Sequence, residues 1–278
     1  MHTVEAPAKI NLGLEVLARR ADGYHNINTI FHRVGLADTV SMSRREQGVT
    51  LACNTPDIPT DARNLCVRAA HTLFAHAGFD GGVHIDLFKR IPDGAGLGGG
   101  SSNAAAVLRT LPALLDLDVT EDALHAIATS IGSDVPFFLH PGSAHATGRG
   151  ERLTYIALAL PYDIVVAHPG VRVPTAWAYG ALALAGTRAA TDLPALLRDH
   201  VSHPAVLRER LHNDFEAPVC AAFPQIAALR QELVDAGADL VLMSGSGSAV
   251  FALFSDHAQA AGCVETVSAP TVHLTPRP

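Results

Sequence analysis

Hydrophobic and polar residues alternate along the segment 83–88 with the two-residue period of a β-strand. Val83, Ile85 and Leu87 occupy the apolar positions, although Phe88 interrupts the polar face. An alanine-rich stretch at 104–108 follows and favours a helix. Glycine and serine dominate the residues between the two, so the pattern predicts a strand, a flexible loop and a helix in this order.

The rest of the chain predicts strands and helices in irregular alternation. The expected strands are 9–16, 28–31, 39–43, 83–88, 144–147, 163–167, 240–243 and 249–254. The expected helices are 62–76, 102–115, 121–131, 175–185, 193–200, 205–211 and 224–236. Such a mixture, with prolines and glycines after residue 158, indicates two domains with a boundary near that residue.

The loop at 92–103 has the composition of a phosphate cradle. Either Ser101 or Ser102 is expected to cap the following helix, whose N-terminus then faces the loop. Unpaired N–H groups and the positive end of the helix dipole favour an anion there, and glycines allow a polyphosphate to approach the main chain. A less specific reading is that small residues let a helix pack closely against a sheet.

Familiar glycine motifs do not account for the loop. Gly100 stands where a P-loop requires lysine. Gly94, Gly96 and Gly99 meet the dinucleotide spacing, but no second buried strand ending in an acid follows about 20 residues later. Protein kinases need His-Arg-Asp and Asp-Phe-Gly, and neither tripeptide occurs.

Three further segments carry polar residues in apolar surroundings. Lys9 and Asn11 lie two residues apart, hence on one face of a strand, where they could grip a phosphate and a hydroxyl or be ordinary exposed residues. Asp134 precedes an apolar stretch and is either a turn residue or a functional carboxylate. A second glycine-serine loop at 243–251 could close over a ligand or only turn a hairpin.

Composition narrows the class of protein. The 278 residues are 48% hydrophobic and carry a formal net charge of −7, which argues against nonspecific nucleic-acid binding. No apolar run reaches membrane length and the first residues do not resemble a signal peptide, so a cytoplasmic location without membrane contact is expected. The four cysteines and 15 histidines are scattered, which disfavours structural zinc and disulfides.

Taken together, these segments resemble the motifs of the GHMP kinases, the family named for galacto-, homoserine, mevalonate and phosphomevalonate kinases. The resemblance covers residues 6 to about 251 and includes Arg20-Ala21-Asp22-Gly23-Tyr24-His25, its most selective segment. It implies an α+β fold of two domains, 1–158 (ribosomal protein S5 domain 2-like, ATP-binding) and 159–278 (a ferredoxin-like α/β sandwich). It also implies transfer of the ATP γ-phosphate to the 2-hydroxyl of a cytidine diphosphate conjugate of methylerythritol, for isoprenoid precursors.

The resemblance assigns residues to three roles. Asp134 is expected to act as general base and Lys9 to orient it and the hydroxyl. The ATP phosphates are expected at Pro92, Gly94, Gly96, Leu97, Gly98, Gly99, Gly100, Ser101 and Ser102, with Mg²⁺ bridging them. The cytidine substrate is expected at Asn11, Tyr24, His25, Thr175 and Tyr179.

Several points stay open at this stage. No protein ligand of Mg²⁺ is assigned, Arg149 has no assigned role, and a monomer or weak homodimer is expected. One alternative is a GHMP enzyme for a smaller acceptor such as homoserine or mevalonate, which would leave Tyr24 and Tyr179 without a base to stack on. Another is a noncatalytic nucleotide-binding sensor, in which Lys9 and Asp134 perform no chemistry.

Overall fold

The computed structural model describes residues 1–183 and 188–277, which form two compact units. The first unit comprises Met1–Ala8, Ala37–Ile91 and Gly98–Pro141, and the second comprises Lys9–Leu36, Pro92–Leu97 and Gly142–Pro278. The units are therefore assembled from non-contiguous segments, whereas the sequence predicts a single cut at residue 158. The long strands β1 (His2–Arg19) and β2 (His25–Arg45) contribute to both units and pair with each other.

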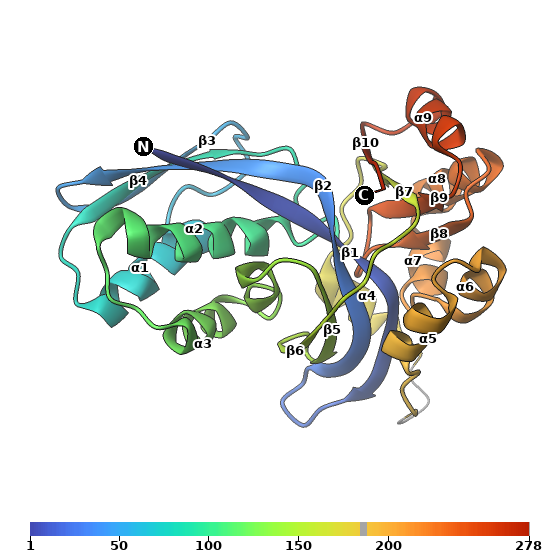
Figure 1. The fold of residues 1–278 in the computed structure, drawn as a ribbon, viewed down its shortest axis with the longest axis horizontal. Coiled ribbons are helices and arrows are strands. Elements are labelled where there is room, and N and C mark those ends of the chain that lie inside the picture. Colours follow the sequence, from blue (N-terminus) through green and yellow to red (C-terminus); the bar gives the residue numbers. More distant parts are fainter. Residues whose placement is uncertain (184–187, 278) are drawn as a thin grey trace. The chain divides into compact units, whose positions relative to one another are not determined.

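The first unit consists of a sheet segment and helices (Figure 1). Strand β4 (Gly82–Phe88) pairs in parallel with β3 (Gly48–Cys53) and antiparallel with the Thr39–Arg45 part of β2. Helices α1 (Leu65–Ala77) and α2 (Gly99–Leu115) pack side by side, and α3 (Glu121–Ile131) and the 3₁₀ helix η1 (Pro136–Leu139) follow. Ala104, Ala105 and Ala106 of α2 are buried because their small side chains allow close helix packing.

Local signals explain the helix ends in this unit. The Asn64 side chain caps α1 by accepting from the N–H of Cys66, and Thr120 caps α3 in the same way through Ala123. The predicted bounds of α3 are confirmed. The expected serine cap of α2 is wrong, because the helix begins three residues earlier and Gly98, in the left-handed region, is its N-cap.

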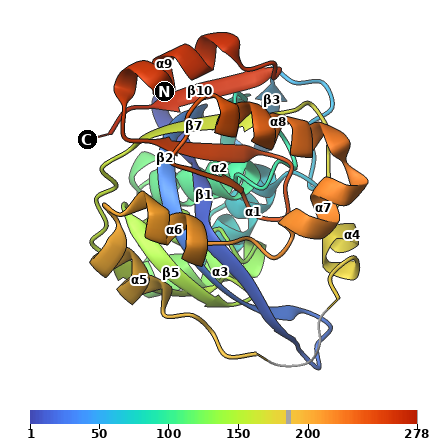
Figure 2. The ribbon, with the colours of Figure 1, turned by 90° about the vertical axis from the view of Figure 1, so that its right-hand side faces the viewer.

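The second unit holds a four-stranded antiparallel sheet in the order β10 (Thr271–Thr275), β7 (Asp163–His168), β9 (Val250–Phe254), β8 (Leu240–Met243). Helices α8 (Pro224–Asp235) and α9 (His257–Thr266) contact this sheet, as Figure 2 shows. Val165, Ala252 and Phe254 join helix residues such as Leu229 and Ala260 in one apolar cluster. The burial of this apolar surface is the main stabilising contribution.

The second unit also contains shorter strands and helices. They are β5 (Ser143–Gly148), β6 (Arg152–Ile156), α4 (Thr175–Gly180), α5 (Leu193–His200), α6 (Pro204–Arg210) and α7 (Glu216–Ala222). Strand β5 pairs antiparallel with Ile27–Phe31 of β2 and with β6. The helix expected at 175–185 ends at Gly180, and the part of that prediction at 184–185 lies outside the described residues.

Candidate active site

The glycine loop leads directly into α2. Gly94, Gly96 and Gly98 have φ values of 64°, 79° and 70°, in the left-handed region that favours glycine. Gly98 makes no side-chain cap hydrogen bond, so no side chain at that position satisfies the first amides of α2. The N-terminus of this 17-residue helix therefore presents the N–H groups and the dipole end that suit a phosphate.

At Gly96 and Gly99, packing within the protein also requires glycine. A Cβ at Gly96 would lie 2.0 Å from the carbonyl oxygen of Ser244, and one at Gly99 would lie 2.9 Å from Cγ2 of Ile91. Neither distance is compatible with a side chain. At Gly100, by contrast, a Cβ would meet only Leu65, at an ordinary 3.6 Å. Close packing thus explains part of the glycine run, and the more open Gly100 is not explained in this way.

One polar atom of the loop is left without a partner. The Oγ atom of Ser102, in the first turn of α2, is buried and makes no hydrogen bond. A buried hydroxyl without a partner costs free energy, and native proteins rarely keep one without a reason. A phosphate oxygen or a phosphate-bound cation at this helix end would supply the missing partner, so the residues present fit a metal-bound polyphosphate.

Lys9 and Asn11 meet on one face of β1, as their spacing predicts. Lys9 is only 3% exposed, and its Nζ donates to Oδ1 of Asn11 at 2.6 Å and to the carbonyl of Gly96 at 3.0 Å. The Oγ of Ser244 donates to the same carbonyl at 3.0 Å. The amide of Asn11 in turn donates to Thr29 at 2.9 Å. The strand, the glycine loop and the second glycine-serine loop are thereby linked through one carbonyl oxygen.

Asp134 lies in the first unit, in the turn between α3 and η1. The turn is closed by the N–H of Val135, which donates to the carbonyl of Gly132 at 3.2 Å. Val135, Phe137 and Phe138 are fully buried, whereas Asp134 is partly exposed. The buried aromatic residues after the turn fix the backbone that carries the carboxylate, which can thus meet a ligand without full loss of hydration.

Two of the predicted substrate residues, His25 and Tyr179, form an aromatic group with Phe215. The rings of His25 and Tyr179 stack at 4.8 Å with an interplanar angle of 16°, and Tyr179 also meets Phe215 edge-on at 4.8 Å. Tyr24 is 56% exposed, and the guanidinium of Arg149 lies 4.8 Å from its ring centroid. Burial, together with the charge of Arg19, lowers the pKa of His25.

Thr175 begins α4 and contacts the second glycine-serine loop, with 3.2 Å between its hydroxyl and that of Ser246. This loop joins the antiparallel strands β8 and β9 and so turns a hairpin. Its closure over a ligand stays a prediction. The structure adds an anchor that the sequence did not indicate: Nδ2 of Asn213 donates to the carbonyls of Met243 and Gly245 at 2.7 and 2.8 Å. A buried asparagine before α7 gives no local sign of this long-range role.

Glu216 completes the anchor of the same loop. One of its carboxylate oxygens accepts from the N–H of Met243 at 2.6 Å and lies 3.2 Å from the Arg230 guanidinium. Burial raises the pKa of Glu216. The start of the loop is therefore held by two side chains, Asn213 and Glu216, that precede β8 in the sequence.

Across residues 1–183 and 188–277, no group of three or more His, Cys, Asp and Glu side chains is arranged to hold a metal ion. In the same ranges no helix combines the length and apolarity needed to cross a membrane.

Models of known protein families match two parts of this chain. Residues 64–142 match the GHMP kinases N-terminal domain and residues 193–271 match the GHMP kinases C-terminal domain. The chain belongs to the GHMP kinase family, whose members are ATP-dependent phosphotransferases, and the expected two-domain α+β fold is confirmed. The two matches lie on either side of residue 158, and the cut at that residue stays a prediction.

Several proteins that are similar to this chain bear the name of the same enzyme. A 4-diphosphocytidyl-2-C-methyl-D-erythritol kinase of Chlorobium phaeobacteroides (strain BS1) is 45% identical over 91% of this chain and 89% of its own length. The protein of that name from Salinibacter ruber is 42% identical, over 99% and 98%. A crystal structure of 4-(cytidine 5'-diphospho)-2C-methyl-D-erythritol kinase, 39% identical, superposes with a TM-score of 0.85 and covers 99% of this chain and 98% of its own. A homoserine kinase from Cytophaga hutchinsonii, at 17% identity and a TM-score of 0.72, shares the fold.

Proposed function

We propose that the protein transfers the γ-phosphate of ATP to the 2-hydroxyl of 4-diphosphocytidyl-2-C-methyl-D-erythritol, giving the 2-phosphate and ADP in isoprenoid precursor biosynthesis. The near-full-length identity of 45% and 42% to two kinases of that name carries the proposal. The aromatic group of His25 and Tyr179, with the exposed Tyr24, supports it because a flat base is bound by stacking on such rings.

The proposed mechanism uses two residues for the chemistry. Asp134 takes the proton of the 2-hydroxyl, the resulting oxygen attacks the γ-phosphorus, and the bond to the ADP oxygen breaks. Lys9 orients the acceptor through Asn11, to which it is bonded, and offsets negative charge that develops in the transition state. Because Lys9 also holds the Gly96 carbonyl, the same ammonium connects the acceptor side with the phosphate loop.

The phosphates are proposed to bind along residues 92–102, at the N-terminus of α2. Ser102 is the residue proposed to face a magnesium ion or a phosphate oxygen, since its buried hydroxyl has no protein partner. Bound Mg²⁺ supplies neutralisation of the polyphosphate charge. The cytidine part is proposed to contact Tyr24, His25 and Tyr179, and Thr175 a polar group of the substrate.

The proposal extends to the organisation of the protein. We expect domains at 1–158 and 159–278, a cytoplasmic location, and a monomer or weak homodimer. Neither nucleic acid nor a membrane is expected as a partner, which fits the net charge of −7 and the full-length match to small-molecule kinases. Sedimentation equilibrium of the purified chain tests the oligomeric state.

An ADP-release assay tests the activity and its alternatives. MgATP is supplied with diphosphocytidyl methylerythritol, homoserine or mevalonate in parallel, and turnover with the cytidine compound alone is expected. Activity only with a smaller acceptor would replace the substrate and keep the kinase. The Asp134→Asn variant is expected to lose roughly 10²–10⁴ in kcat; full turnover by this variant would refute its role as base. Absence of turnover in the intact chain with all three acceptors would favour the nucleotide sensor.

A further inference from the structure

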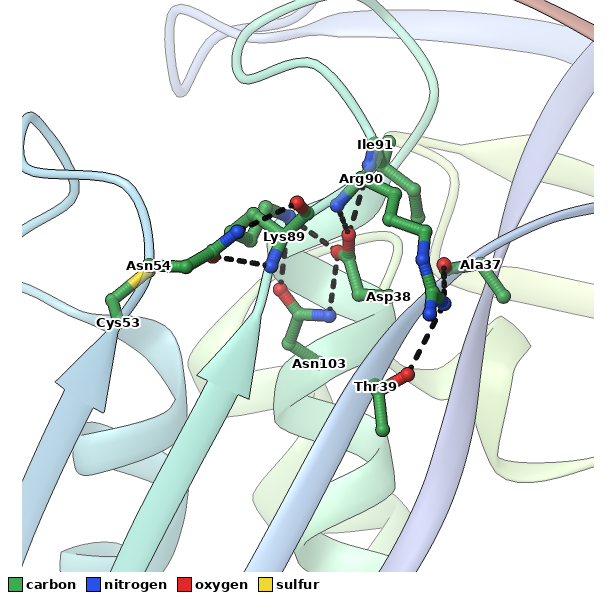
Figure 3. A network of polar contacts seen from close by, with 9 residues as sticks. All are labelled: Ala37, Asp38, Thr39, Cys53, Asn54, Lys89, Arg90, Ile91 and Asn103. Carbon is green, nitrogen blue, oxygen red and sulfur yellow. Dashed lines mark hydrogen bonds and ion pairs between the residues drawn. The ribbon is translucent and has the colours of Figure 1, made fainter.

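A buried carboxylate in the first unit binds the chain on both sides of the glycine loop. Asp38 lies on β2, among the side chains drawn in Figure 3. It is 0% exposed. Its Oδ1 accepts from the main-chain N–H groups of Arg90 at 2.6 Å and Ile91 at 2.8 Å, the last residues before Pro92. Its Oδ2 accepts from Nδ2 of Asn103 at 2.9 Å, the residue that follows Ser102.

Lys89 binds both Asp38 and Asn103. Its ammonium forms a buried ion pair with Oδ2 of Asp38 and donates to Oδ1 of Asn103 at 3.1 Å. The charges of Asp38 and Lys89 cancel, and both oxygens of the carboxylate have partners, as a buried charge requires. The same ammonium would lie 3.1 Å from a Cβ at Gly99, so α2 begins in direct contact with the pair.

The backbone of Lys89 is fixed independently. Oδ1 of Asn54 accepts from its N–H at 2.7 Å, and Nδ2 of Asn54 donates to its carbonyl at 3.2 Å (Figure 3). The guanidinium of Arg90 donates to the carbonyl of Ala37 and the hydroxyl of Thr39, each at 3.2 Å. The entry to the loop is thus bonded to three neighbouring segments, whereas the loop itself carries five glycines between residues 92 and 102.

We propose that Asp38 is a positioning residue for the nucleotide: by binding the residues before and after the glycine loop to one carboxylate, it holds the loop and the start of α2 in the conformation that receives the ATP phosphates. A loop rich in glycine loses much conformational entropy when it is ordered. Fixing both ends before the ligand arrives removes part of that cost from binding. The inference rests on the proposed function only in taking this loop as the phosphate site.

Asn103 offers the mildest test. In Asn103→Ala the pair of Asp38 and Lys89 remains, and only the tie to α2 is lost. Binding of MgATP is measured by isothermal titration calorimetry on the full chain without acceptor, and cooperative thermal unfolding verifies the fold. We expect the Kd for MgATP to rise about tenfold, because the loop must be ordered on binding. A folded Asn103→Ala variant that binds MgATP within about twofold of the wild type would overturn the proposal.

Exchanging the carboxylate and the amide between positions 38 and 103 provides a rescue experiment for MgATP binding. Asp38→Asn alone places an amide donor against the donors of Lys89 and Asn103, so MgATP binding is expected to fall more than in Asn103→Ala. Asp38→Asn combined with Asn103→Asp returns one acceptor to each donor and keeps the charge of Lys89 balanced, and it is expected to recover most of the affinity. A double variant that folds but binds no better than Asp38→Asn would contradict the proposal.

The matched control is Asp163, a carboxylate equally buried at 1% exposure that accepts from the N–H of Arg277 at 2.8 Å and from His257 at 3.0 Å. Asp163→Asn is expected to lower stability and leave the Kd for MgATP unchanged; an equal loss of MgATP affinity would show a general effect of buried charge removal and refute the proposal. Because binding is measured without acceptor, a wild type that binds MgATP but ignores the cytidine substrate would refute only the proposed function.

Discussion

Lys9 reaches across 87 residues of sequence to the carbonyl of Gly96, which its ammonium holds at 3.0 Å. Ser244 donates to the same oxygen at 3.0 Å, so the carbonyl has one charged and one neutral donor. A hydrogen bond from a charged donor is the stronger of the two. The position of Gly96 in the phosphate loop therefore depends on the residue that is proposed to act in phosphoryl transfer.

This arrangement predicts different effects for the two donors. Lys9→Met is expected to lower kcat about 100-fold or more, since it removes the cation and a buried donor. Ser244→Ala, the control, keeps the cation and is expected to lower kcat less than about tenfold. Both variants are expected to lose about 1–3 kcal/mol in the free energy of unfolding, measured in urea. Equal effects on kcat would mean that the charge of Lys9 has no part in the reaction.

Substitutions at Gly96 and Gly48 distinguish the effect of a steric clash from the effect of backbone strain. Both have positive φ, 79° and 75°, but a Cβ at Gly48 meets nothing within 4 Å. Gly96→Ala is expected to lower the free energy of unfolding by about 3 kcal/mol or more and to raise the KM for ATP. Gly48→Ala is expected to lower it by about 1 kcal/mol without effect on KM. Similar losses in the two variants, measured by urea unfolding, would contradict the close approach to Ser244.

Substitution of Ser102 is expected to weaken nucleotide binding without lowering the stability of the protein. Because its buried hydroxyl has no partner, Ser102→Ala is expected to leave the ligand-free protein unchanged or up to about 1 kcal/mol more stable. The Kd for MgATP is expected to rise about tenfold through loss of a ligand contact. Thermal unfolding with and without MgATP measures both effects. An unchanged increase in Tm on addition of MgATP would refute the contact.

Tyr179 and Trp177 lie on the same short helix but contact different rings. Tyr179 stacks on His25, whereas Trp177 meets Phe223 edge-on at 5.2 Å. Tyr179→Ala is expected to raise the KM for the cytidine acceptor about tenfold, because a stacking surface is lost. Trp177→Ala is expected to change it less than about twofold. Initial rates at saturating ATP provide the measurement, and an unchanged KM in Tyr179→Ala would favour a smaller acceptor.

The side chain of His32 is expected to make the folded protein less stable in mild acid. Burial lowers its pKa to about 4, below the value of about 6.5 expected in the unfolded chain. Between these values the unfolded chain binds a proton that the folded chain does not, so stability falls as the pH falls from about 7 towards 4. The loss from this group between pH 7 and pH 5 is expected to be about 1–2 kcal/mol.

A substitution isolates this contribution. His32→Gln keeps a polar partner for Ser143, whose hydroxyl lies 2.7 Å from Nδ1 of His32, but it does not titrate. Urea unfolding at pH 7 and pH 5 is expected to show a smaller acid loss in this variant than in the wild type. The same loss in both proteins would show that other groups control the pH dependence.

Several elements were predictable because their signals are local. The threonine cap and acidic first turn of α3 give its bounds, and the two-residue spacing of Lys9 and Asn11 places them on one face of a strand. The strands β3, β6 and β10 and the helices α7 and α9 were not predicted. Strand β10 pairs with β7 about 100 residues earlier, and its stability depends on that partner more than on its own pattern.

The sequence by itself determined the family, the order of the main elements and the types of residue offered to a nucleotide and a base. Only the tertiary structure decided which partners these residues have. The carboxylate of Asp38 binds residues 51 to 65 positions away, and Asn213 holds a loop 30 positions away. Local propensity and periodicity extend over a few residues, whereas hydrogen bonds of buried side chains depend on which distant segments the folded core brings together.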